Sequence, residues 1–340
     1  MVELDWTGRG VVVRIGRVKV YPLKFRPIPK ERPWGGHKLR EVFGKDLPAG
    51  EKIGESWELA DLPEDKSVIT NGELARKTIH WAIGEYPKEI MGDASLIEGA
   101  FPLLIKLLDA QDILSVQVHP DPETCKRMGR GEPKPKPQPK PKTECWYIIS
   151  AEPGSVIYKG LKEGVTKEQF TEAIEKGSVE DMLVKIPVEV GQCHFLPAGT
   201  VHAIGPGLLI AEIQTPSDTT YRVYDWGRVD EAGKSRELHI KEALESIHFD
   251  SSGDNLSVTK IGRLVDCKYF KVDKGHQGKN CELLISTGKM KTLIIISGSG
   301  TFTGAGDEVK FAAGDTLLLP AIYEGVTRFA DDTQYLTVTI

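Results

Sequence analysis

The chain has 340 residues, a formal net charge of −5 and 40 % hydrophobic residues, a composition typical of a globular protein. The negative charge offers no basic surface for nucleic acid or an acidic membrane. No apolar run is long enough to cross a bilayer, and the N-terminus lacks the features of a secretory signal. The 5 cysteines show no CxxC spacing, which disfavours a disulfide framework and a thiolate metal site and predicts a reducing, cytoplasmic location.

The first part of the chain is predicted to hold few regular elements. Residues 1–20 include the alternating stretch VVVRIGRVKV, which is typical of a strand or of a loosely attached extension. Residues 21–36, YPLKFRPIPKERPWGG, contain too much proline for a helix interior and predict an extended lead-in. Helical periodicity first appears at about residues 74–98.

One segment alternates proline with lysine. Glu132–Lys142 has the sequence EPKPKPQPKPK, which excludes a helix or a central strand and predicts an extended polyproline II conformation. The simplest interpretation is a solvated linker. The alternative is a basic flap over a site, because the segment runs directly into Thr143 and Glu144.

Two more helices and many strands are predicted downstream. Residues 166–185 predict a helix that opens with a capping box, since Gln169 follows Thr166 by three residues, and residues 238–247 predict another. Most of the remainder predicts short strands bounded by turn residues, such as LSVQVHP, ECWYIIS, LLIAEIQ, TTYRVYDW and KTLIIIS. The 35 glycines and 21 prolines suit tight turns between such strands. We therefore expect a mainly β fold, a sandwich or barrel with helical insertions.

The sequence contains a weak internal repeat. Gly191–Pro197 and Gly314–Pro320 both consist of a glycine, five residues expected to form a strand, and a proline. A chance match between two turn–strand–turn units is the alternative. We interpret the repeat as two related β-domains, with an extension over residues 1–20, a first domain over 21–255 that carries the chemistry, and a degenerate second domain over 256–340.

Three short motifs carry candidate chemistry. In QVH the side chains of Gln117 and His119 are two residues apart, so in a strand they share one face. A strand histidine is more often a surface or hydrogen-bonded residue than a metal ligand. Glu144 opens the strand ECWYII, where a solvent-facing position is the common alternative. His202 closes PAGTVH, in which proline and glycine turn out of a strand and present a histidine inward.

Together these motifs resemble type I mannose-6-phosphate isomerases of the cupin superfamily. The resemblance runs in order from about residue 21 to residue 250. It is carried by ERPWGG and by IGESWEL (53–59), LSVQVHPD (114–121), KTECWYI (142–148), PAGTVHAI (197–204) and TYRVYD (220–225). The resemblance implies two cupin-like jelly-roll barrels with helical insertions, of which the second is degenerate. It also implies an isomerase that interconverts mannose 6-phosphate and fructose 6-phosphate through a cis-enediol.

The resemblance also implies a metal centre. The positions of the family's zinc ligands are occupied here by Gln117, His119, Glu144 and His202. One Zn²⁺ per chain is expected, and Mn²⁺, Co²⁺ or Fe²⁺ would also suit imidazole and oxygen donors. A coordination position left for substrate or water would make the centre catalytic. The expected partner is a hexose 6-phosphate, with no nucleic acid or membrane, bound by a monomer or a weak homodimer.

Four residues complete the predicted site. Ser115 and Lys142 each lie two residues before a predicted ligand and resemble substrate-contacting residues of the family. The alternative for Lys142 is that it is only the last charge of the proline–lysine segment. Glu212 in LLIAEIQ is the expected general base, and Lys142 is the runner-up for proton transfer to oxygen or for ring opening. Arg222 in TYRVYD is expected to stabilise the enediolate. The alternative for Glu212 and Arg222 is a structural ion pair.

Two other functions are compatible with the sequence. An iron-dependent cupin oxygenase uses a related set of ligands, but Gln117 as a ligand weighs against it, and Lys142 and Arg222 favour an anionic substrate. The second alternative is a sugar-sensing cupin without activity, because cupins have many functions. The ordered motifs favour the isomerase over both.

Overall fold

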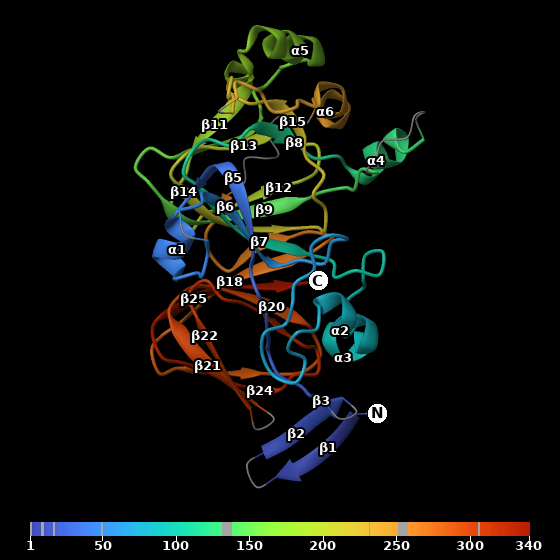
Figure 1. Ribbon diagram of the computed structural model, residues 1–340, viewed down its shortest axis with the longest axis vertical. Coiled ribbons are helices and arrows are strands. Elements are labelled where there is room, and N and C mark those ends of the chain that lie inside the picture. The colour runs from blue at the N-terminus through green and yellow to red at the C-terminus, as the bar shows by residue number, and fades with distance from the viewer. Residues whose placement is uncertain are drawn as a thin grey trace.

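The molecule consists largely of antiparallel β-sheets that follow one another along its long axis (Figure 1). The computed structural model describes residues 2–7, 10–15, 18–48, 50–130, 138–230, 232–250, 258–304 and 307–340. The predicted fold class, mainly β with helical insertions, is confirmed. Within these ranges, no helix is long and apolar enough to span a membrane.

The first pair of sheets contains the predicted site. The seven-stranded sheet has the order β16 (Val258–Thr259), β12 (Cys193–Leu196), β9 (Glu144–Ala151), β14 (Leu208–Gln214), β7 (Leu104–Ala110), β6 (Ile53–Leu59) and β5 (Ile28–Gly36). The five-stranded sheet has the order β11 (Leu183–Pro187), β10 (Val156–Leu161), β13 (His202–Ile204), β8 (Val116–Val118) and β15 (Tyr221–Tyr224).

The second pair of sheets is built mainly from the C-terminal part of the chain. The six-stranded sheet has the order β17 (Arg263–Asp266), β18 (Lys271–Gln277), β25 (Thr333–Thr339), β20 (Lys291–Ser297), β23 (Thr316–Leu319) and β4 (Leu23–Lys24). The four-stranded sheet has the order β19 (Glu282–Ile285), β24 (Gly325–Phe329), β21 (Ser299–Gly304) and β22 (Asp307–Ala312).

The strand orders of the two pairs correspond. The series β12-β9-β14-β7 matches β23-β20-β25-β18, and β11-β10-β13-β8 matches β22-β21-β24-β19. Strands β12 and β23 belong to the two copies of the sequence repeat, and each follows a glycine with positive φ, Gly191 at 88° and Gly314 at 85°. The predicted domain limits stay predictions. Strand β4, from the predicted first domain, pairs with β23 of the second sheet pair, and β16, from the predicted second domain, pairs with β12 of the first.

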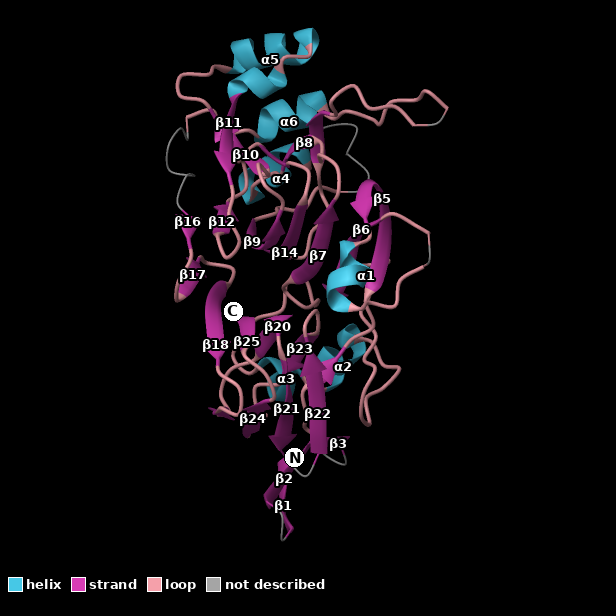
Figure 2. Cartoon of the chain, turned by 90° about the vertical axis from the view of Figure 1, so that its left-hand side faces the viewer, coloured by secondary structure: helices cyan, strands magenta, loops and turns pink. Residues whose placement is uncertain are grey.

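The helices lie at the ends and edges of the sheets. They are α1 (Lys38–Phe43), α2 (Ile79–Glu85), α3 (Pro87–Met91), α4 (Pro122–Met128), α5 (Lys167–Lys176), the 3₁₀ helix η1 (Val179–Met182) and α6 (Ile240–Ser246). Figures 1 and 2 place α5 and α6 at the far end of the first sheet pair, and α2 and α3 beside the second. The capping box at Thr166 and Gln169 is present, and Gly177 caps the C-terminal end of α5 with a φ of 71°, which suits glycine.

Two further sequence expectations concern the N-terminal residues and the proline–lysine segment. The N-terminal residues form a small three-stranded antiparallel sheet of β1 (Val2–Thr7), β2 (Gly10–Ile15) and β3 (Val18–Lys19), as the alternating pattern allows. Residues 132–137 of the proline–lysine segment lie outside the described residues, and residues 138–143 have no regular secondary structure.

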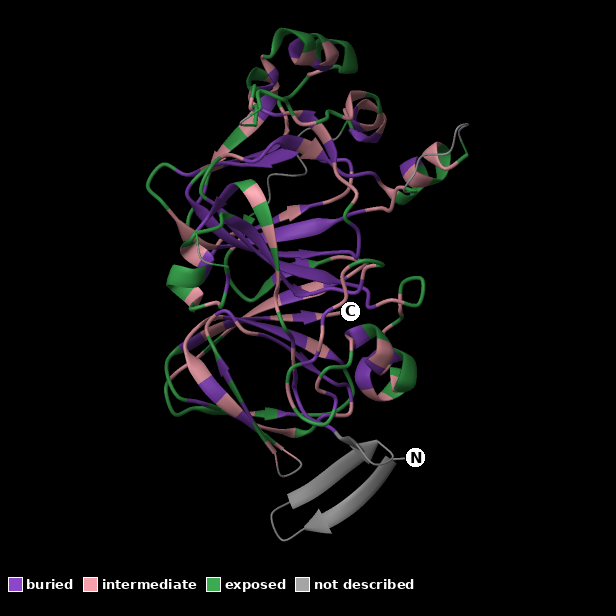
Figure 3. Cartoon of the chain, in the orientation of Figure 1, coloured by how far each residue is buried: buried purple, intermediate pink, exposed green. Residues whose placement is uncertain are grey.

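Alternation along β9 separates two cores. Cys145 and Tyr147 belong to the largest apolar cluster, which also contains Leu318 and Val338 from the second sheet pair. Trp146 belongs to a different cluster enclosed by the first pair of sheets. The buried residues accordingly concentrate in the strands (Figure 3). Because side chains alternate along a strand, Glu144 points to the same interior as Trp146.

Candidate metal centre and active site

The strand register brings the predicted ligands together. His202 opens β13 and lies directly opposite Gln117 of β8. Glu144 opens β9 and lies opposite Gln214 of β14. His119 follows β8 and shares the face of Gln117, as expected for residues two apart.

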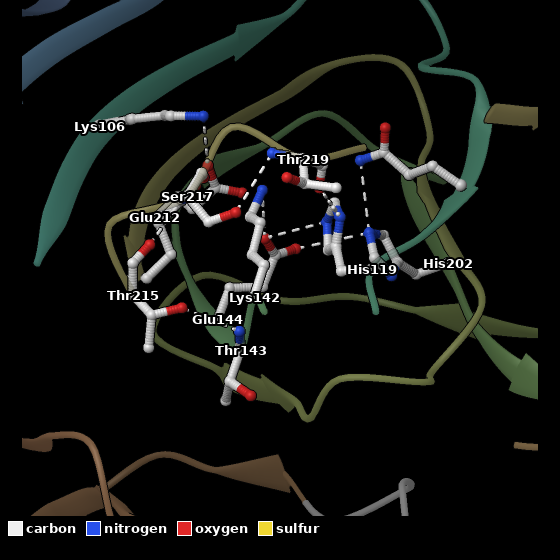
Figure 4. Close-up of polar contacts among 12 residues, drawn as sticks. Lys106, His119, Lys142, Thr143, Glu144, His202, Glu212, Thr215, Ser217 and Thr219 are labelled. Atoms are coloured by element: carbon white, nitrogen blue, oxygen red, sulfur yellow. Dashed lines mark hydrogen bonds and ion pairs between the residues drawn. The ribbon is translucent and has the colours of Figure 1, made fainter. Parts of the chain in front are cut away.

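The two histidines and Glu144 point to one spot (Figure 4). His119 Nε2 lies 3.4 Å from Glu144 Oε2, and His202 Nε2 lies 3.5 Å from Glu144 Oε1. One donor atom from each residue lies within 4.8 Å of the others, and all three side chains are buried. Among the described residues, no other cluster of three His, Cys, Asp or Glu side chains has this geometry.

Backbone carbonyls set the tautomers of both histidines. His119 Nδ1 lies 2.9 Å from the carbonyl oxygen of Thr219, and His202 Nδ1 lies 2.9 Å from that of Thr200. A carbonyl only accepts, so each Nδ1 carries the proton and donates it, which leaves each Nε2 lone pair toward Glu144. His119 Nε2 and Glu144 Oε1 are buried and have no hydrogen-bond partner, whereas Glu144 Oε2 forms an ion pair with Lys142. Such orphaned acceptors are costly unless a cation binds them.

The protonation states also suit a cation. Burial, together with the charge of Lys142, lowers the pKa of His119 to about 3, and burial lowers that of His202. Burial opposes ionisation of Glu144, but Lys142 and the two histidines hold its pKa well below its ordinary value. The contacts between neutral imidazoles and Glu144 are therefore not ion pairs at neutral pH. Two neutral imidazoles and a carboxylate are a typical donor set for a divalent metal.

Gln117 stands beside this group. Its Nε2 lies 3.3 Å from His202 Nε2. The oxygen and nitrogen of an amide exchange places when the group rotates by half a turn, so Oε1 occupies the same position in the other rotamer. The donor set thus fits a metal ion held by two imidazoles, one carboxylate and one amide oxygen.

Lys142 is part of the buried site rather than the solvated end of the proline–lysine segment. Its side chain is 4 % exposed, and its Nζ lies 2.8 Å from Glu144 Oε2. The contact neutralises Glu144 in the absence of another cation. It also holds an ammonium group beside the position where the donor atoms converge.

A cavity of about 450 Å³ lies next to these residues. Five predicted site residues line it, namely Ser115, Gln117, Lys142, Glu212 and Arg222. Arg222 Nε donates to Ser115 Oγ at 3.3 Å, and Arg222 Nη1 donates to the carbonyl oxygen of Glu237 at 2.7 Å. The guanidinium is half-buried and permanently charged, so the cavity wall carries a fixed positive group.

Glu212 has a partner that the sequence patterns did not identify. Lys106 Nζ lies between two carboxylates, 3.2 Å from Glu212 Oε2 and 3.7 Å from Glu55 Oε2. Trp146 Nε1 donates to Glu212 Oε1 at 3.0 Å. The structural ion pair expected for Glu212 therefore exists, but with Lys106 and not with Arg222. The sequence signal that could have identified Lys106 is its position as the single lysine in the buried apolar run LLIKLL.

The pKa values of Glu55 and Glu212, the two carboxylates beside Lys106, are shifted in opposite directions. Burial opposes the ionisation of Glu55, but Lys106 and Arg32 lower its pKa to about 2. Burial raises the pKa of Glu212, and the negative charge of Glu144 adds to the rise, although the charges of Lys142 and Lys106 oppose it. Because Glu144 repels a second negative charge, Glu212 lies closer to its neutral form than its ion pair alone would suggest.

Comparison with known proteins identifies the family. Residues 23–149 match the model of the catalytic domain of type I phosphomannose isomerase. The chain is 37 % identical over 314 residues to mannose-6-phosphate isomerase ManA of Bacillus subtilis, which covers 88 % of this chain and 93 % of that protein. The chain belongs to the type I phosphomannose isomerase family. It is 35 % identical to the mannose-6-phosphate isomerase of Streptococcus mutans, with 88 % and 92 % covered.

Solved structures agree with this family membership. The crystal structure of the Bacillus subtilis mannose 6-phosphate isomerase has a TM-score of 0.80 at 31 % identity, covering 94 % of this chain and 99 % of that one. A mannose 6-phosphate isomerase bound with zinc and yttrium shares the fold, with a TM-score of 0.71 at 15 % identity over 94 % and 99 % of the chains. The predicted resemblance is confirmed, and the chain is an isomerase.

Proposed function

We propose that this chain interconverts mannose 6-phosphate and fructose 6-phosphate with the help of one divalent metal ion, in the first place Zn²⁺. Its ligands would be Gln117, His119, Glu144 and His202. The observation that carries the proposal is the convergence of buried donor atoms, among them the unpartnered His119 Nε2 and Glu144 Oε1, beside a cavity lined by cations. When bound, the ion supplies positive charge that polarises the sugar oxygens.

Substrate binding is proposed to use Ser115, Lys142 and Arg222. All three line the cavity, and the last two are cations facing a substrate that is a phosphate dianion. Lys142 is fixed by Glu144, so its remaining N–H donors bind oxygen atoms close to the metal position. Ser115 is held by Arg222 and presents its hydroxyl on the same wall.

Glu212 is proposed as the general base that moves a proton between C1 and C2. This transfer needs a base whose pKa lies nearer to neutrality than that of an ordinary carboxylate. Burial and Glu144 shift the pKa of Glu212 in that direction. Trp146 and Lys106 each hold one carboxylate oxygen, which fixes the plane of the group. Lys142 is the alternative residue for proton transfer to oxygen or for ring opening.

Arg222 is proposed to stabilise the negative charge that develops on the enediolate oxygen. Its guanidinium is anchored through Ser115 and the carbonyl of Glu237, so it requires no rearrangement as charge develops. Its register partner is the metal-ligand candidate Gln117, so Arg222 lies on the strand next to the one that carries this candidate.

Glu212→Gln tests the assignment of the base. Glutamine still accepts a hydrogen bond from Trp146 but cannot take up a proton, so kcat should fall about 100- to 10,000-fold while bound zinc stays stoichiometric. Turnover of mannose 6-phosphate in a coupled assay and metal analysis provide the measurements. The wild-type enzyme should lose activity on chelation and regain it with zinc.

A matched control is Glu58→Gln. Glu58 is also a buried carboxylate paired with a lysine, Lys45 at 2.8 Å, but it does not line the cavity. The control should keep its kcat. Unchanged kcat in Glu212→Gln would eliminate Glu212 as the base.

The identity of the native metal, the cytoplasmic location and the monomer or weak homodimer stay predictions.

A further inference from the structure

The connection Thr215–Thr219 lies between the strands that carry Glu212 and Arg222 and contacts the end of the proline–lysine segment. Ser217 Oγ donates to the carbonyl of Lys140 at 3.0 Å, and the backbone N–H of Lys140 donates to Thr219 Oγ1 at 3.0 Å. Thr143 N–H donates to Thr215 Oγ1 at 3.2 Å. Several hydroxyls of one connection thus hold the backbone of another segment.

Proline explains why hydroxyl groups are needed here. Pro139 and Pro141 have no N–H, so residues 139–143 cannot form a regular ladder with a neighbouring strand. The three N–H groups that remain are all paired, those of Lys140 and Thr143 with hydroxyls and that of Lys142 with the carbonyl of Pro120 at 3.1 Å. Side-chain oxygens therefore take the place of a partner strand.

The same connection also holds a metal-ligand candidate. The carbonyl of Thr219 accepts the Nδ1 proton of His119 (Figure 4). The equivalent partner of His202 is the carbonyl of Thr200, only two residues away in the chain. His202 is therefore oriented by its own turn, whereas His119 depends on a residue 100 positions distant.

Thr219 consequently contacts two parts of the active site at once. Its hydroxyl holds Lys140, two residues before Lys142, and its carbonyl holds His119. Ser217 supports this arrangement, because Ser217 Oγ accepts from the backbone N–H of Thr219 at 3.2 Å and is itself 1 % exposed as a residue. The hydroxyl and the carbonyl that make these two contacts belong to the same residue.

We propose that Thr219 is a positioning residue whose hydroxyl couples the end of the proline–lysine segment to the metal centre. It fixes the backbone that delivers Lys142 and, through its carbonyl, the tautomer and ring orientation of His119. The inference rests on the proposed metal function. Mutating a residue that orients a metal ligand from outside the coordination shell typically lowers metal affinity 10- to 100-fold.

The test compares Thr219→Val with Thr219→Ser. Valine has the shape of threonine without the hydroxyl, whereas serine keeps the hydroxyl. Zinc affinity of the chelated protein, measured by competition with a chromophoric chelator, should weaken about tenfold in Thr219→Val and return to within about twofold in Thr219→Ser. Nitrogen NMR of labelled histidine should show His119 losing its single Nδ1–H tautomer in the valine variant only.

Glu98→Gln is the matched control. It removes the exposed ion pair between Glu98 and Lys140 Nζ, at 2.7 Å, and leaves the hydroxyl contacts in place. It should not change zinc affinity. Equal zinc affinity in wild type and Thr219→Val, or equal weakening in the serine and valine variants, would overturn the proposal.

Two further outcomes separate the possible failures. If Thr219→Val does not fold, Ser217→Ala carries the same test, because it removes the bonds to Lys140 and to Thr219 N–H. It should weaken zinc binding, and unchanged affinity would count against the coupling. If wild type binds no zinc, the proposed metal function fails together with this inference.

Discussion

The two pairs of sheets share one strand order but fill it differently. The register places Ile285 and Gly325 of the second pair where Gln117 and His202 face each other in the first. Lys291 opens β20 as Glu144 opens β9, and each lies opposite the last residue of the repeat strand in its own sheet, Leu319 of β23 and Leu196 of β12. Three of the four candidate ligands thus have counterparts that cannot form this centre.

The interior of the second pair is closed by aromatic rings. Phe302 and Phe311 have ring centroids 5.0 Å apart, and Phe311 and Phe329 have centroids 6.0 Å apart. A Cβ on Gly325 would lie 2.5 Å from Tyr323 Oη, so no side chain fits where His202 lies in the first pair. The comparison shows that one strand frame supports either a polar cavity or a packed core, depending on a few inward side chains.

The largest expected effect comes from removing a candidate metal ligand in the first pair of sheets. His202→Ala should abolish stoichiometric zinc and lower turnover about a thousandfold or more, because the donor set loses an imidazole. Lys291→Ala, at the position matching Glu144, should change neither. Metal analysis and the coupled assay check both variants. Full turnover in His202→Ala would remove the metal centre from the mechanism.

A deletion in the second pair should affect stability instead. Phe311→Ala removes a ring that is 3 % exposed and packed between two others, so it should lower the free energy of unfolding by about 3–5 kcal/mol. Zinc affinity at 25 °C should stay the same. Denaturant unfolding and metal titration provide the measurements. A parallel loss of zinc affinity would show that the two pairs are energetically coupled.

The smallest expected effect concerns pH. His194 of β12 corresponds to Leu317 of β23, and burial with the charge of Lys159 lowers the pKa of His194 to about 4. Below the ordinary histidine pKa of 6.5 the unfolded state binds a proton that the folded state does not, so stability falls between pH 6.5 and pH 4, by about 3 kcal/mol at most. His194→Leu should remove this part of the loss of stability at acid pH.

The pH prediction is checked by the difference in unfolding free energy between wild type and His194→Leu. Unfolding free energies of wild type and His194→Leu, measured from pH 7.5 to pH 4, should converge toward higher pH and diverge in favour of the leucine variant as pH falls. Parallel curves would show that His194 is protonated without cost in the folded protein.

Local patterns in the sequence predicted a large part of this molecule. The capping box at Thr166, the glycine–strand–proline repeat and the candidate-ligand pair Gln117 and His119 all depend on residues close together in the chain. Helices α1 and α4 were not predicted, because each is short and depends on its caps and on packing, for example Asp121 accepting from Thr124 N–H. The predicted helix over 166–185 instead ends at Lys176.

The sequence by itself determined the fold class, the family and the chemical types of the candidate ligands, because strand alternation and turn residues are local signals. Only the tertiary structure decided which groups meet. Strand register placed Lys106 opposite Glu212, and the path of the connection after β14 placed the carbonyl of Thr219 on His119. Such pairings are set by packing between distant segments, which no local pattern specifies.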